Sequence, residues 1–206
     1  MSPKTPLLDP ADYFRDRLDP FMPGAGVFVL YVVVELALAY LLVQFMLDRV
    51  TGLSPGERSM VRSELSNIFV AAILVAVVAW FVVAVVMHFG VGGPETRGSF
   101  GDAMGVAGWA YAPEIVTAIP IYLYARHRIA GLDLDTSDPQ AFQAEVESLA
   151  GGTADGVLVL LLLAVTVWSV YILAKGVSET HDVSLSRATL PAVVVGIGSF
   201  VLTLAA

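Results

Sequence analysis

The sequence has no cysteine among its 206 residues. A chain without thiols forms no disulfide bond, performs no thiol chemistry and binds no metal through cysteine. The absence of cysteine is compatible with an oxidising as well as a reducing compartment. Charged residues are also scarce, at 15% of the chain, whereas hydrophobic residues make up 57%. With a mean hydropathy of +0.77, this composition excludes a soluble globular protein.

Basic residues are fewer than acidic ones, with 11 Lys and Arg against 19 Asp and Glu, and the net charge is −8. An acidic exterior repels nucleic acids and anionic headgroups, so nucleic acid is excluded as a partner. Most of the acids fall in tails and loops. Adaptation to salt accounts for such an exterior without any further function.

Recognisable catalytic motifs are missing. The sequence has no Walker loop, no glycine fingerprint for dinucleotides, no GxSxG elbow and no HExxH helix. We therefore predict no cofactor and no enzymatic activity. An intramembrane enzyme would need a nucleophile at membrane depth, and Thr166 and Ser199 have no histidine near them in sequence.

Histidine occurs only three times. His88 lies near the end of an apolar run, where polar groups reach water, so we predict an interfacial side chain rather than a ligand. Glu179, His181 and Asp182 could in principle hold a metal. Three residues without a fourth ligand favour a solvated loop instead, and we predict no metal site.

What the chain does have is five long apolar runs, at about residues 24–47, 67–89, 102–124, 156–174 and 188–206. About 20 apolar residues suffice for a helix to cross the hydrocarbon core of a bilayer. Lipid requires every backbone polar group to be satisfied within its own segment. The sequence therefore predicts an all-α polytopic membrane protein with five transmembrane helices in one bundle, formed by residues 24–206 after a tail of residues 1–23.

Short helices are predicted outside the runs. Asp9–Pro10 is typical of a helix start, and Tyr13 and Phe14 give the following segment an apolar side, as in a helix that lies in the membrane interface. Ser54 and Glu57 match a capping box ahead of the second run. A second amphipathic helix is predicted in the long third connection, where its start and apolar stripe are Asp138–Pro139, Phe142, Val146 and Leu149.

The third run differs from the others because it is rich in glycine and proline. Small residues at three- and four-residue steps predict a face where another helix approaches closely. The fifth run offers a second such contact, and the predicted packing residues are Gly101, Gly105, Gly108, Ala112, Ala192 and Gly196. Pro113 removes one backbone donor and leaves the carbonyl of Trp109 free, so a kink is expected there.

Two carboxyl groups lie deep in the apolar runs, Glu35 near the middle of the first and Glu114 near the middle of the third. A bare carboxylate at that depth costs roughly 2.5–3.5 kcal/mol, so each must be protonated, paired or facing a wet cavity. One interpretation is a proton or cation site at the Pro113 kink. The alternative, favoured because no basic residue lies mid-span, is two protonated carboxyls that stabilise helix packing.

The Lys and Arg residues divide almost evenly between the two faces of a five-span protein. The face that carries the N-terminus holds six of them and the opposite face five. The positive-inside rule therefore predicts a cytoplasmic N-terminus and an external C-terminus for this multi-pass chain.

Three parts of the sequence resemble the Yip family of Ypt/Rab-interacting membrane proteins and their prokaryotic relatives. They are the pre-span segment Asp9–Phe14, the glycine-rich third span with its mid-span proline in Gly98–Phe100 and Gly105–Pro113, and the fourth span with its exit loop in Trp168–His181 and Arg187–Ala188. The resemblance, to a prokaryotic-type member, implies a five-helix membrane domain with a cytoplasmic N-terminus. Eukaryotic relatives are associated with vesicle traffic and small GTPases, and no catalytic residue is implied.

Two functions stay open. The first is a non-enzymatic adaptor or organiser that acts through helix contacts, with the bilayer and other membrane proteins, or a second copy of the chain, as partners. The second is a small transporter or channel whose path is lined by Glu35 and Glu114 beside the interrupted third span.

Overall fold

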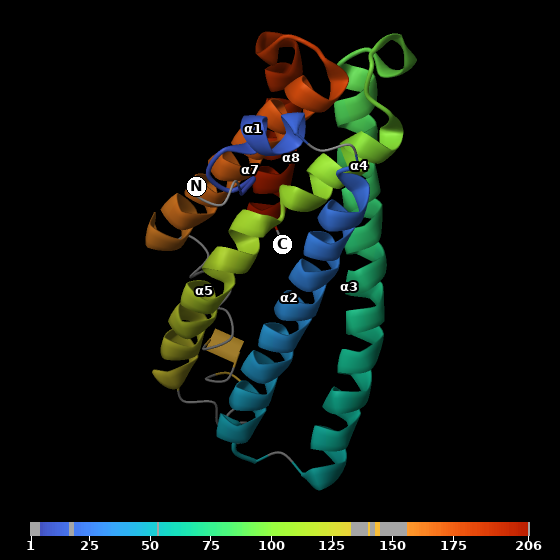
Figure 1. The fold of residues 1–206 in the computed structure, drawn as a ribbon. Coiled ribbons are helices and arrows are strands. Elements are labelled where there is room, and N and C mark those ends of the chain that lie inside the picture. Colours follow the sequence, from blue (N-terminus) through green and yellow to red (C-terminus); the bar gives the residue numbers. More distant parts are fainter. Residues whose placement is uncertain are drawn as a thin grey trace.

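The computed structural model describes residues 5–16, 19–52, 54–132, 140, 143–144 and 156–205. Within these residues the chain forms α-helices and one short 3-10 helix (Figure 1), namely α1 Pro10–Arg15, α2 Phe21–Arg49, α3 Pro55–Gly90, η1 Gly93–Glu95, α4 Phe100–Trp109, α5 Ala112–Ala130, α7 Gly156–His181 and α8 Leu185–Ala205. Five helical segments are long and apolar enough to cross a membrane, with α4 and α5 together forming the third. The predicted all-helical, five-span fold is confirmed.

The predicted helix starts are present where the structure describes them. The Asp9 side chain accepts a hydrogen bond from the backbone N–H of Asp12, and Pro10 is the first residue of α1. Ser54 and Glu57 form both bonds of a capping box, so α3 begins at Pro55, well ahead of its apolar run. The amphipathic helix predicted around Asp138–Pro139, Phe142, Val146 and Leu149 lies outside the described residues.

The third span is interrupted rather than kinked. Helix α4 ends at Trp109, a turn follows at Ala110 and Tyr111, and α5 begins at Ala112. Because Pro113 lacks a backbone N–H, it cannot bond the carbonyl of Trp109. The neighbouring carbonyl of Ala110 accepts a hydrogen bond of 2.7 Å from Ser169 Oγ of α7. A partner on another helix therefore satisfies part of the broken ladder at membrane depth.

Glycines bring α2 and α4 into backbone contact. A Cβ atom built on Gly24 would lie 2.0 Å from the carbonyl oxygen of Gly105, and one on Gly108 would lie 2.2 Å from that of Gly24. On the other side, a Cβ on Gly105 would lie 2.5 Å from the backbone of Pro20. No side chain fits between these two helices, so their crossing depends on glycine at these positions.

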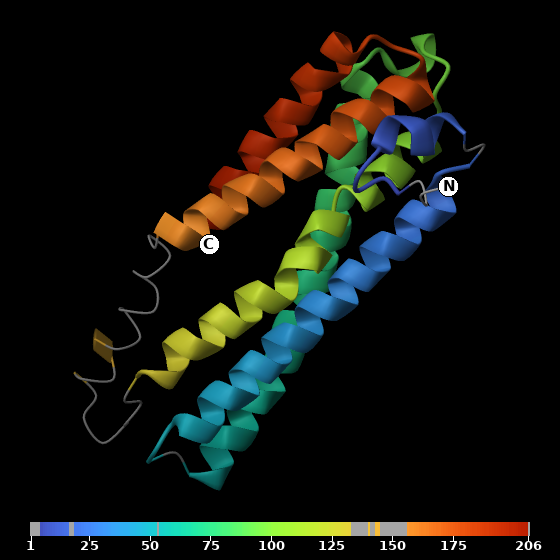
Figure 2. The same cartoon turned by 60° about the vertical axis from the view of Figure 1, so that its left-hand side comes forward.

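The buried core lies at one end of the bundle, where α1, α4, α7, α8 and the last turns of α3 meet (Figure 2). Its members are mostly small or branched side chains, among them Ala84, Met87, Ala103, Val106, Ala107, Ile172, Leu173, Val177, Ala188 and Ala192. Helices α7 and α8 form an antiparallel hairpin. It diverges from α2 and α5 toward the end at which α7 begins and α8 ends (Figure 2).

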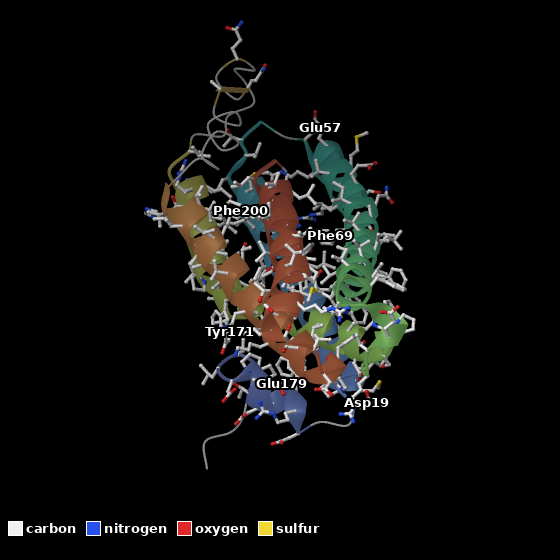
Figure 3. The ribbon with its side chains drawn as sticks, turned by 90° about the horizontal axis from the view of Figure 1, so that it is seen from above. Asp19, Glu57, Phe69, Tyr171, Glu179 and Phe200 are labelled. Atoms are coloured by element: carbon white, nitrogen blue, oxygen red, sulfur yellow. The ribbon has the colours of Figure 1, made fainter. Side chains whose placement is uncertain are left out.

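Helix α1 packs across the C-terminal half of α7, at the end of the bundle that holds the buried core. Its Tyr13 and Phe14 belong to the core, with Phe14 only 2% exposed, and the indole N–H of Trp168 donates to the carbonyl of Leu7 at 2.8 Å. Arg15 forms two hydrogen bonds of 3.0 Å with Glu179, which lies beside α1 in Figure 3. The apolar side of this amphipathic helix is thus buried in protein instead of facing lipid.

Helix α3 packs on the bundle along a single narrow stripe. Between Pro55 and Val82 no side chain is fully buried, and the half-buried ones are Arg58, Leu65, Phe69, Ala76 and Trp80. These positions follow one another at steps of seven and four, the spacing of one helix face. At about 1.5 Å per residue, the 36 residues of α3 extend for about 54 Å, well beyond a hydrocarbon core of about 30 Å.

Candidate functional site

A partly open cavity of about 400 Å³ lies between helices α2, α5, α7 and α8. Polar groups line one part of it, namely Tyr31, Glu35, Glu114, Thr117, Tyr122, Thr166, Ser199 and Thr203. Apolar side chains complete the wall, namely Leu38, Ala39, Leu42, Ala118, Ile121, Ala125, Leu162, Val165 and Phe200. A smaller space of about 50 Å³ adjoins it and shares Glu114, Thr166 and Ser199.

The two intramembrane carboxyl groups lie on the same cavity. Glu35 comes from the middle of α2 and Glu114 from the first turn of α5, and the two interact electrostatically. The phenol of Tyr31, one turn before Glu35 on α2, lines the same cavity and interacts with the Glu114 carboxyl group. The structure therefore brings together two residues that lie 79 positions apart in the chain.

The interruption of the third span places Glu114 at a helix N-terminus inside the membrane. The first backbone N–H groups of a helix lack intrahelical partners and carry partial positive charge, so a carboxyl group in the first turn is favourable there. Pro113 occupies the second position of α5, where its missing N–H costs no helical bond. The helix break that accommodates Pro113 thus also places the Glu114 carboxyl group in the first turn of α5.

The threonine hydroxyls on the cavity all point their hydrogens at the backbone. Thr117 donates to the carbonyl of Pro113 at 3.0 Å, Thr166 to that of Leu162 at 2.9 Å, and Thr203 to that of Ser199 at 2.9 Å. A hydroxyl that has donated its hydrogen still carries lone pairs. These three threonines therefore present acceptor oxygens to the cavity.

No lysine, arginine or histidine is among the described residues that line the cavity. A charged carboxylate in this wall therefore has no basic side chain beside it, and a proton or an incoming cation would offset the charge that the N-terminus of α5 leaves uncompensated. Arg126 and Arg128, farther along α5, have other contacts: Arg126 lies over the Phe45 ring and Arg128 contacts the hydroxyl of Tyr124. The chemistry available at this site is cation or proton binding.

The predicted packing residues have different surroundings. Gly105 and Gly108 meet α2 as described above, and Ala112 is buried. A Cβ on Gly196 would lie 2.3 Å from Val170 of α7, and Ala192 is fully buried. Gly101 faces open space, with only Ser99 Oγ within 4 Å of a built Cβ. The helices that meet these small residues are helices of the chain itself.

A buried histidine pair is the polar feature that sequence reasoning missed. His88 of α3 and His181 of α7 face each other with Nδ1 and Nε2 3.0 Å apart, and they are 6% and 0% exposed. The interfacial position predicted for His88 is therefore wrong, because the η1 turn and the packing of α3 on α7 enclose its ring. Gly98 makes room for the pair, since a Cβ there would lie 2.4 Å from the His181 ring.

Glu179, His181 and Asp182, the possible metal ligands in the sequence, each have a different partner. Glu179 pairs with Arg15, His181 with His88, and Asp182 with Arg97 at 3.0 Å. In the described part of the chain, no group of three or more His, Cys, Asp or Glu side chains could hold a metal ion. The contact between His88 and His181 could not be predicted from the sequence, because the two histidines lie 93 positions apart.

Comparison with known proteins gives one match. The profile of the Yip1 domain matches residues 4–205, nearly the whole chain. Searches of curated proteins and of solved structures returned no match. With five membrane-spanning candidates and a full-length profile match, the chain belongs to the Yip1 domain family of multi-span membrane proteins.

Proposed function

We propose that this protein is a non-enzymatic membrane adaptor or organiser that contacts other membrane proteins, or a second copy of itself, through its helices. The observation that carries the proposal is the surface of α3. Only one narrow stripe of this helix touches the bundle, and large apolar side chains project from its remaining faces, among them Ile68, Val70, Leu74, Val75 and Val78.

Most of the small residues predicted to pack against a helix are already covered by this chain. Gly105, Gly108 and Gly196 pack against other helices of the chain, so a partner would have to displace them. Helix α3 offers the alternative, because its burial is confined to Ala84, Met87 and His88 near its end. Its first turns also project beyond the hydrocarbon core, where Met60 is exposed.

Crosslinked co-purification from native membranes, read by mass spectrometry, tests this function. A variant with Leu74, Val75 and Val78 changed to Ala on α3 is compared with one that changes Ile197, Val201 and Leu202 to Ala on α8, where exposure is similar. We expect a stoichiometric partner with the wild type, loss of that partner in the α3 variant and its retention in the α8 variant. Equal recovery in both variants would count against the proposal.

A second candidate, a small transporter or channel, is supported by one specific observation. Glu35 and Glu114 share a cavity beside an interrupted span, and half-helix ends at the bilayer midplane are typical of transporter sites. Flux of protons or cations in proteoliposomes tests it. We expect the Glu114→Gln variant to fold and to lose the flux, whereas flux equal to the wild type would remove the candidate.

The prokaryotic-type affiliation and the cytoplasmic N-terminus are further parts of this proposal. The basic residues, six on the face of the N-terminus and five on the opposite face, support this orientation.

A further inference from the structure

We propose that the cavity between α2, α5, α7 and α8 is a binding site for a protonated amine carried on an apolar body. This site is independent of the helix contacts proposed for α3. It would supply the transporter candidate with its ligand class, but binding at the site does not require transport.

Charge is the first reason. Glu35 and Glu114 face one cavity, and no basic side chain is among the described residues that line it. In a low-dielectric setting, a cation that enters such a site offsets a charge that no basic side chain compensates. An anionic ligand would meet the two carboxyl groups and is disfavoured for the same reason.

Hydrogen-bonding capacity is the second reason. The hydroxyls of Thr117, Thr166 and Thr203 donate to backbone carbonyls one turn earlier. These three hydroxyls therefore face the cavity as acceptors, as do the ionised carboxyl groups, whereas the hydroxyls of Ser199 and Tyr122 can accept as well as donate. A primary ammonium group has three donors and no acceptor, which is the complement of this wall.

Size is the third reason. A cavity of about 400 Å³ is far larger than a bare ion needs, since one water molecule takes about 30 Å³, and it lies in the range of small-molecule sites. Aliphatic side chains such as Leu38, Ile121 and Leu162, with the ring of Phe200, form the rest of the wall. These surfaces suit an apolar body next to the ammonium group.

The amine could come from two sources, a free small amine or the ethanolamine headgroup of a lipid, and the cavity is open enough for either. The first arm of the test uses the full chain in phosphatidylcholine nanodiscs, titrated with benzylamine and, as the uncharged isostere, with benzyl alcohol by calorimetry. We expect binding of benzylamine only. Glu35→Gln and Glu114→Gln should each weaken it at least tenfold, whereas Asp48→Asn, an exposed carboxyl group outside the cavity, should leave it unchanged.

The second arm uses native mass spectrometry of protein reconstituted with equal amounts of phosphatidylethanolamine and phosphatidylcholine. If the lipid is the source, the wild type retains phosphatidylethanolamine preferentially and the two glutamine variants lose that preference. Circular dichroism first establishes that each variant is folded. If Glu114→Gln does not fold, the result for Glu35→Gln decides the test.

Binding in either arm that depends on the glutamates supports the proposal. Absence of such binding in both arms, or equal binding of benzyl alcohol, overturns it. Amine binding without flux would remove the transporter candidate and leave this site intact.

Discussion

At the scale of single residues, Gly24 shows most directly how the sequence determines packing. Its α carbon lies against the backbone of Gly105 on α4, so that any side chain at Gly24 would collide with backbone rather than with a movable side chain. We expect Gly24→Ala to destabilise the protein by about 1–3 kcal/mol, the usual cost of overpacking a tight contact. The midpoint of thermal unfolding in detergent measures the effect.

Gly26 provides the matched control on the same helix, because nothing lies within 4 Å of a Cβ built there. Gly26→Ala should leave the midpoint unchanged or raise it slightly, since alanine favours a helix more than glycine does. If Gly24→Ala and Gly26→Ala shift the midpoint equally, the close α2–α4 contact is not present in solution.

The histidine pair gives a second residue-scale prediction. Replacing His88 or His181 alone leaves the other ring buried without its partner, which costs about 1–3 kcal/mol. Replacing both by Phe should cost less than the sum of the two single changes, because no polar group is then stranded. A double-mutant cycle on thermal stability should give a coupling of about 0.5–3 kcal/mol. Additive effects would contradict the pairing.

Polar residues in the runs could be predicted from sequence only in part. Glu35 and Glu114 stand out because a carboxyl group in an apolar run is conspicuous, but their shared cavity depends on how α2 and α5 cross. His88 gives no comparable signal, because its position near a span end fits an interfacial side chain equally well. Its burial follows from the η1 turn and from Gly98, which lie outside its own helix.

At the scale of elements, the interruption of the third span depends on a contact from another helix. Ser169 of α7 donates to the carbonyl of Ala110 in the turn between α4 and α5. We expect Ser169→Ala to destabilise the protein by about 1 kcal/mol, since a buried carbonyl loses its partner. Thr189→Ala is the control, because this half-buried residue's hydroxyl donates to the carbonyl of Leu185 within its own helix. Equal unfolding midpoints for the two variants would argue against a role for Ser169.

The docking of α1 on α7 is predicted to depend on apolar packing more than on its ion pair. The Glu179 carboxylate raises the pKa of Arg15 above its ordinary value through a hydrogen bond, but Arg15 is more than half exposed, and solvent-exposed pairs contribute little to stability. Phe14 is almost fully buried, and its truncation costs about 3–5 kcal/mol. In hydrogen exchange of residues 5–16, Phe14→Ala should therefore release α1 and Arg15→Ala should not. The reverse order would refute this account.

Most elements could be predicted because their signals are local. The cap at Ser54 and Glu57, the start at Pro10 and the five apolar runs each depend on residues close in sequence, and all appear in the fold. The extent of the interruption could not be predicted, because Pro113 accounts for a kink but the satisfied turn also needs Ser169 from α7.

At the scale of the whole molecule, we predict an orientation in the membrane with a cytoplasmic N-terminus. The absence of cysteine makes it easy to measure, since any introduced cysteine is the only thiol. Ser186 and Ser59 are both exposed, and they lie near the starts of α8 and α3, which are at opposite ends of the bundle (Figure 1). The two variants are Ser186→Cys and Ser59→Cys. With the N-terminus cytoplasmic, an impermeant thiol reagent added outside intact cells should label Ser59→Cys and spare Ser186→Cys. The opposite pattern would reverse the topology.

The central claim is that the exposed surface of α3 contacts a protein partner in the membrane. The most direct measurement places a photo-crosslinking amino acid at Val75 or Val78 of α3, and at Leu202 of α8 as a control of similar exposure, in native membranes. The account predicts one recurring protein adduct, or a dimer of the chain, from both α3 positions and lipid adducts alone from position 202. Lipid adducts alone from all three positions would contradict it.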